Sequence, residues 1–99
     1  MSNATLRKAK ITKADLKRAN LVGCNLESTD FRHSNLTDAC LRSCDLTNSN
    51  MSNSILLNSD ISFANLKGTD LTRAVLTGIN RQGANLSMGG VIRTNGNAK

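Results

Sequence analysis

Residues 14–23 read Ala-Asp-Leu-Lys-Arg-Ala-Asn-Leu-Val-Gly, two units of five in which a small residue, an Asp or Asn and a Leu precede two further residues. The unit recurs along the chain of 99 residues, because a large apolar residue stands at 17 of 18 consecutive positions spaced five apart. We call this position the centre of each repeat. The centres are Leu6, Ile11, Leu16, Leu21, Leu26, Phe31, Leu36, Leu41, Leu46, Met51, Leu56, Ile61, Leu66, Leu71, Leu76, Leu86 and Val91, and Arg81 occupies the remaining one.

A period of five residues fits neither an α-helix nor one continuous strand. At 3.6 residues per turn the centres would be spread around the whole circumference of a helix, and in a strand the side chains alternate with a period of two. Short extended segments joined by corners do fit, with the small residue and the centre both pointing inward. The second residue after the centre is often Gly or Asn, as the positive φ of a type II turn prefers: Gly23, Asn48, Asn53, Asn58, Gly68, Gly78 and Gly83.

The substitutions among the centres indicate how many sides each coil has. Six centres are not Leu, and all six lie in the series that begins at Ile11 and advances by ten. A coil of 15 residues would mix this series with the other one in every column, whereas a coil of 20 keeps the two on separate pairs of opposite faces. Cys24 and Cys44 also recur at a spacing of 20. The sequence therefore predicts an all-β fold, a four-sided parallel β-helix.

Several units share one pattern, an Ala followed by Asp or Asn and then Leu: Ala14-Asp15-Leu16, Ala19-Asn20-Leu21, Ala64-Asn65-Leu66 and Ala84-Asn85-Leu86. They resemble the A-(D/N)-L-x-x motif of the pentapeptide-repeat family, and the resemblance covers residues 4 to about 92. It implies a right-handed quadrilateral parallel β-helix, a hand that agrees with the general preference of parallel crossovers. We expect a single domain over residues 1–99, with about four and a half coils and a frayed tail at residues 93–99.

Two features depart from a regular, closed tower. Arg81 occupies a centre, and an unpaired guanidinium inside a narrow core is costly, so we expect the last coil to be distorted there, with Arg81 reaching solvent. Ile79 stands at the small position just before it. The ends lack the polar caps that solenoids normally carry. This predicts end-to-end self-association, and the alternative is that the chain is one part of a longer repeat array.

The sequence holds no motif for chemistry. His33, the single histidine, falls on a corner facing outward, and the Asp residues belong to the repeat and are dispersed over the sides. Paired catalytic carboxylates need a cleft, which a filled tower does not provide. We therefore expect no enzyme activity, no cofactor and no metal. Cys24, Cys40 and Cys44 form no C-x-x-C pair, so we expect reduced thiols, although the stacking of Cys24 on Cys44 leaves a disulfide open.

The formal net charge is +6, and most of it comes from the first coil. Six cations against Asp15 give residues 1–20 a charge of +5. This basic patch suits nucleic acid or an acidic protein, but the lack of nearby aromatic residues for base stacking disfavours nucleic acid. The patch consists of Arg7, Lys8, Lys10, Lys13, Lys17 and Arg18.

An apolar surface is the best candidate contact site for a protein partner. Ile55 and Val75 occupy the outward position before the centre, 20 residues apart, so they should be stacked on one face beside Leu57. Phe63 lies outward at a later corner, in a column with small residues. Clustered exposed apolar residues are typical of interaction sites, whereas scattered ones are ordinary.

Together these observations predict a non-catalytic structural scaffold that binds an unidentified protein partner. The family resemblance suggests an alternative, a mimic of duplex DNA that inhibits or protects DNA gyrase, but that activity rests on an acidic, long rod. Weak nucleic-acid binding by the basic patch is a third hypothesis. No apolar run is long enough to span a membrane, and the first ten residues lack a secretory signal, so the expected location is the cytoplasm.

Overall fold

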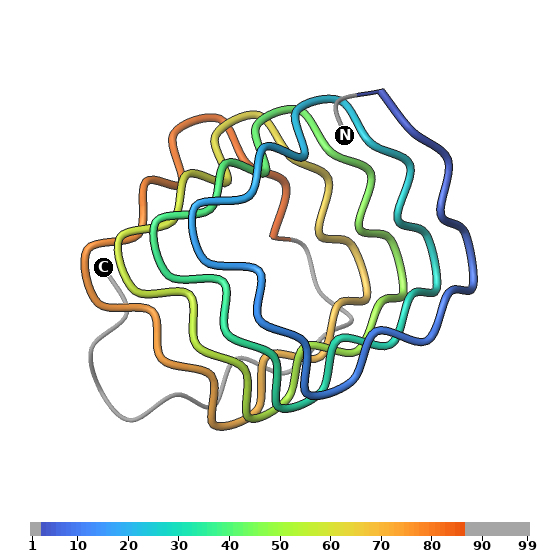
Figure 1. The fold of residues 1–99 in the computed structure, drawn as a ribbon. Helices are drawn as coiled ribbons and strands as arrows, with labels where there is room; N and C mark the ends of the chain where they lie inside the picture. Colours follow the sequence, from blue (N-terminus) through green and yellow to red (C-terminus); the bar gives the residue numbers. More distant parts are fainter. Residues whose placement is uncertain (1–2, 87–99) are drawn as a thin grey trace.

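The computed structural model describes residues 3–86, which wind into a stack of four-sided coils (Figure 1). Within this range the chain forms no helix and no continuous strand, because each straight side contributes a single residue to a parallel bridge. The bridges join residues twenty apart, from Thr5 and Asn25 to Asn65 and Asn85. Twenty residues per coil, at five per side, confirm the four-sided arrangement. Residues 87–92, which the expected four and a half coils include, and the expected frayed tail at 93–99 lie outside the described range.

Each corner is a type II turn. In the first, the backbone N–H of Ala9 donates to the carbonyl of the centre Leu6 at 3.0 Å. The second residue after the centre has a positive φ at every described corner, with thirteen non-glycine residues and four glycines. This region costs an ordinary residue roughly 1–2 kcal/mol. Bonds between coils compensate for it, as where the N–H of Lys8 donates to the carbonyl of Glu27 at 2.9 Å. The turn was predicted from the Gly and Asn residues at this position, and it also forms where the residue is Lys, Arg or Phe.

The core is filled by the centres, which stack in columns along the tower. Leu26 and Leu46 are both 0% exposed, and each buried Leu stabilises the fold by roughly 1.5–3 kcal/mol before entropy is subtracted. Leu6 and Leu86, at the two ends of the described column, are only half-buried, since the described residues place a neighbouring coil on one side of each. The middle of the tower therefore holds the completed core, and the first coil exposes apolar side chains.

A second column of contacts runs inside the tower, through hydroxyl groups at the small positions. Thr29 donates to the carbonyl of Leu6 at 3.0 Å, and Thr69 donates to that of Leu46 at 2.7 Å. Each donor thus lies one coil after its acceptor. These bonds satisfy buried polar groups that would otherwise destabilise the core. They account for Thr29, Ser34 and Thr69 in place of Ala, whereas the buried hydroxyls of Ser49 and Ser59 at the same position make no hydrogen bond.

Arg81 is exposed, as expected, but the predicted distortion of its coil is wrong for the residues described. The N–H of Ala84 donates to the Arg81 carbonyl at 3.0 Å, as at the other corners. Gly83 has a φ of 69°, and Asn85 bridges Asn65 in register. The side chain of Arg81 thus reaches solvent while the backbone keeps the geometry of the repeat. Ile79 packs half-buried against the core.

Candidate interaction surfaces

The outward residue before each centre is usually Asp or Asn, and its side chain has a structural role. At the corner after Leu16, Asp15 Oδ1 accepts the N–H of Lys17 at 3.2 Å. The same bond, from the residue two further on and at 2.9–3.2 Å, forms at all eleven Asp and Asn residues in this position from Asp15 to Asn80. Such bonds fix a turn locally. These Asp and Asn side chains therefore stabilise the corners, and we call each such contact a bracing bond.

The described residues contain no grouping suited to metal binding or acid–base chemistry. No cluster of three or more His, Cys, Asp or Glu side chains that could hold a metal ion occurs among residues 3–86. His33 is exposed on a corner, as predicted. None of the described residues forms a helix able to cross a membrane. The surfaces that remain as candidates are apolar or cationic.

The predicted contact of Ile55 with Val75 is present on one side of the tower. The two residues form a parallel bridge, and the N–H of Leu56 donates to the Val75 carbonyl at 2.8 Å. Ile55 is 38% exposed, whereas Val75 and Leu57 are half-buried. We call Ile55, Leu57 and Val75 the lateral stripe. Ile55 and Val75 replace the Asp and Asn of their column, Asp15 and Asn35, so the bracing bond to the following corner is missing there.

Phe63 is the most exposed large apolar residue described, but it does not belong to the lateral stripe. Its side chain is 50% exposed and projects from a corner a full side away from Leu57. The guanidinium of Arg42 lies over the ring, 5.1 Å from its centroid. Cation–π contacts at exposed sites contribute about 0.5–1 kcal/mol. The register of twenty places Ser62, not Phe63, next to Arg42, so the repeat alone does not predict this contact.

The six cations of the basic patch are all exposed on the first coil, as predicted. Arg7 is paired with Glu27 of the next coil, with Nε and Oε1 3.0 Å apart. Below them, Arg32 binds Asp30 through both carboxylate oxygens, and this hydrogen bonding holds the pKa of Asp30 below its ordinary value. The charged groups of the other cations of the patch are exposed to solvent at this end of the tower.

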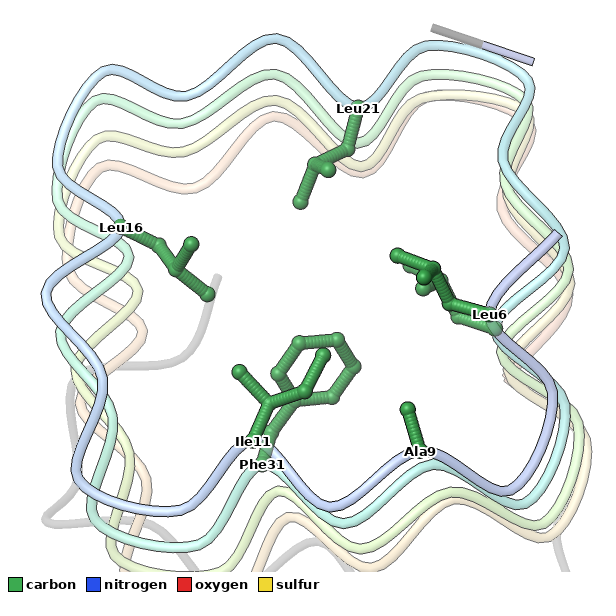
Figure 2. A pocket seen from close by; sticks show the side chains of 7 residues that line it. Leu6, Ala9, Ile11, Leu16, Leu21 and Phe31 are labelled. Carbon is green, nitrogen blue, oxygen red and sulfur yellow. The ribbon is translucent and has the colours of Figure 1, made fainter. Parts of the chain in front are cut away.

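The same end contains an apolar pocket of about 220 Å³, which the sequence did not reveal. Figure 2 looks down the axis and shows Leu6, Leu16 and Leu21 pointing inward from three sides, with Ile11 over Phe31 on the fourth. We call it the end pocket. Its lining residues are Leu6, Ala9, Ile11, Leu16, Leu21, Leu26 and Phe31. Its volume depends on how far these side chains reach across the coil, which the repeat alone does not give.

The thiols lie at different depths. Cys24 and Cys44 are buried in adjacent coils, and Cys40 is half-buried on the outer surface. All three are reduced thiols in the structure. Cys44 Sγ donates to the carbonyl of Leu21 at 2.8 Å, and burial raises the pKa of this thiol to about 12. Cys44 therefore remains protonated, and unreactive as a nucleophile, at neutral pH.

The fold and its surfaces define a solenoid of five-residue repeats with a filled core. A family model described as a pentapeptide repeat region matches residues 2–71. The chain belongs to the pentapeptide repeat family, whose members form right-handed quadrilateral β-helices.

Solved structures show the same fold. A pentapeptide repeat protein of the Arabidopsis thaliana thylakoid lumen is 26% identical with a TM-score of 0.76, and the match covers 89% of this chain and 64% of that one. QnrB1, a plasmid-mediated fluoroquinolone resistance protein, is 16% identical with a TM-score of 0.60, over 87% of this chain and 52% of that one. That likeness shows the fold alone. The chain thus spans less than two thirds of either protein, and comparison with curated proteins gave no match.

Proposed function

We propose that this chain is a non-catalytic scaffold that binds a protein partner through the lateral stripe. The observation that supports it is the loss of the bracing Asp or Asn at two consecutive positions of one column. Ile55 and Val75 stand there side by side, and Ile55 is 38% exposed. The other described departures, Thr5, Lys10 and Cys40, are each alone in their columns. A partly exposed aliphatic pair in place of two turn-stabilising groups is the pattern of a contact surface.

The competing explanation is that the pair stabilises only the tower. β-branched residues suit a bridging position, and a cross-strand pair of them contributes roughly 0.2–1 kcal/mol. Asp or Asn in the same place would restore a hydrogen bond of similar value. Stability alone therefore does not favour Ile and Val over the residues of the repeat. Their exposed area is better explained by a partner that covers it.

The test compares the wild-type chain with the double variant Ile55→Asn, Val75→Asn as baits in extracts of the native cell. Asn is the residue of the repeat, so the fold should survive. The proposal expects a partner, identified by mass spectrometry, that is enriched by the wild type and lost with the variant. Cys40→Asn, which restores the repeat on another side, is the matched control and should retain it. Equal enrichment by all three proteins would refute a role for the lateral stripe.

A further inference from the structure

We infer that the N-terminal end of the tower is a second docking site, for an acidic protein segment that inserts one apolar side chain into the end pocket. The inference rests on the proposed function in one respect, that the tower binds protein, but it assigns a different surface and a chemical class of partner. Two independent features carry it. One is the volume and lining of the pocket, and the other is the charge that surrounds it.

The end pocket has the size of one side chain. Its volume of about 220 Å³ exceeds the roughly 150 Å³ of an apolar cavity known to hold benzene. Leu6, Leu16 and Leu21 converge on it from three sides, while Ala9 leaves room on the fourth (Figure 2). Leu6, Ile11 and Leu16 are only half-buried in the isolated tower. An aromatic or branched aliphatic side chain placed here would complete their burial.

Cations alternate with the lining residues along the chain. Arg7 and Lys8 separate Leu6 from Ala9, and Lys10 separates Ala9 from Ile11. Lys13, Lys17 and Arg18 continue the pattern around the next two corners. Asp15 is the one acidic residue among residues 3–22, so this coil carries a charge of +5. Charges of one sign on the same coil add to the potential that an approaching anion meets, and this attraction falls off over a Debye length of about 8 Å.

The charge of the rest of the chain disfavours a second copy, or the C-terminal residues of this chain, as the occupant. A second copy docking head to head would place +5 against +5. Residues 63–82 carry Lys67, Arg73 and Arg81 against Asp70, a charge of +2, so the other end of the tower is also cationic. Residues 87–99 contain Arg93 and Lys99 and no acidic residue. Electrostatic complementarity therefore favours a different, acidic chain.

The pocket also distinguishes a protein segment from nucleic acid. Phosphates would satisfy the cations, but they would leave the apolar end uncovered. Base stacking needs an accessible aromatic face, and Ile11 covers Phe31 at this end (Figure 2). A segment with carboxylates on both sides of one large apolar residue satisfies both parts of the site. It buries the half-exposed Leu residues and pairs with the surrounding cations.

The binding assay uses a synthetic peptide of one Trp flanked by three Glu on each side. Because the protein contains no Trp, the emission of the peptide reports its burial without background. We expect saturable binding, with a dissociation constant on the order of 100 μM or tighter and a blue shift of the Trp emission. A peptide with Gly in place of Trp, whose binding is measured by calorimetry, should have a dissociation constant higher by roughly tenfold or more. A peptide with Gln in place of Glu should lose the dependence on salt.

Two variants locate the site. Ala9→Leu fills the end pocket from a half-buried position and should weaken binding of the Trp peptide by about tenfold or more. Lys13→Glu should weaken it by about threefold to tenfold. Arg73→Glu is the matched control, because Arg73 stands in the column of Lys13 with the same backbone conformation, φ 60° against 58°, far from the pocket. It should leave the affinity unchanged. Unaltered melting temperatures, checked by circular dichroism, assign these effects to binding.

Three results would overturn the inference. Equal loss with Lys13→Glu and Arg73→Glu would show binding to net charge alone. Tighter binding of duplex DNA or anionic vesicles, insensitive to Ala9→Leu, would assign the basic patch to another class of ligand. Self-association that Ala9→Leu abolishes, seen by sedimentation, would make a second copy the occupant. The lateral-stripe variant should bind the peptide normally, so a failure here leaves the proposed function standing, and the converse also holds.

Discussion

The ring of Phe63 lies over Gly83 of the next coil, with Cδ1 2.6 Å from the point where a Cβ on Gly83 would project. Gly83 has a φ of 69°, a conformation that its neighbours at equivalent corners adopt with full side chains. Glycine is therefore required here less by the backbone than by the aromatic ring. The three other described glycines at corners, Gly23, Gly68 and Gly78, lie in the same way beneath an Asn of the preceding coil.

The variant Gly83→Ala should destabilise the tower by about 2 kcal/mol. Roughly 1 kcal/mol comes from the left-handed backbone, and the rest comes from displacing the Phe63 ring from its contact with Arg42. In the background of Phe63→Ala the same substitution should cost only the backbone part. Urea denaturation of the two single variants and the double variant measures the coupling. Costs that simply add would show that the ring does not constrain position 83.

The sequence was sufficient to predict the coil, and the reason is physical. Large apolar residues at every fifth position are all buried only if the chain turns a corner between them. The separation of the non-Leu centres into one series, together with the recurrence of Cys24 at Cys44, favoured four sides over three. The bridge of Asn25 with Asp45 confirms that register. The exposure of Arg81 was predicted correctly, and the error concerned the backbone. The corner keeps its hydrogen bond and its register while the side chain alone reaches solvent.

The candidate sites were only partly predictable. Ile55 beside Val75 could be inferred from the spacing of twenty, and the structure places both on one side. Phe63 was predicted at a later corner and lies there, but its contact with Arg42 was not predicted. The end pocket escaped the sequence because its volume depends on side-chain reach. The bracing bonds escaped it because a preference for Asp or Asn does not say which N–H is bound.

Replacing Ile55 with Asn should change the free energy of unfolding by no more than about 1 kcal/mol. The variant loses a cross-strand aliphatic pair but gains an acceptor for the N–H of Leu57, as Asn35 provides for Thr37 in the preceding coil at 3.0 Å. Leu56→Ala, one residue away but 1% exposed, should cost about 2–5 kcal/mol. Thermal melts of the two variants check the contrast. Similar losses at both positions would mean that Ile55 is part of the core.

Two hydroxyls in one inner column should behave oppositely. Thr69 donates to the carbonyl of Leu46 at 2.7 Å, whereas the buried Ser49 hydroxyl makes no hydrogen bond in the structure. Thr69→Val keeps the shape but removes a donor, and should cost about 1 kcal/mol. Ser49→Ala removes an unpaired polar group and should leave the stability equal or higher. Chemical denaturation resolves the difference, and a larger loss at Ser49 would contradict the assigned bonding.

The thiol of Cys44 should make the tower less stable in alkaline solution. Burial raises its pKa in the folded state to about 12, from an ordinary value of 9.0. Below pH 9 the thiol is protonated in both the folded and the unfolded state, so it adds no pH dependence. Above that pH the unfolded state releases the proton first, and the free energy of unfolding falls as the pH rises toward 12.

Cys44→Ser provides the matched control for this pH dependence. Serine is already used at the same inward position, where Ser34 donates to the carbonyl of Ile11 at 2.6 Å, and its hydroxyl does not titrate in this range. The difference in unfolding free energy between wild type and variant should therefore be constant up to about pH 9 and then shift in favour of the variant. Titrating lysines affect both proteins equally and cancel. A difference that stays flat to about pH 11 would mean that the folded tower lets the Cys44 thiolate reach water, and the closed core around Leu21 would have to be abandoned.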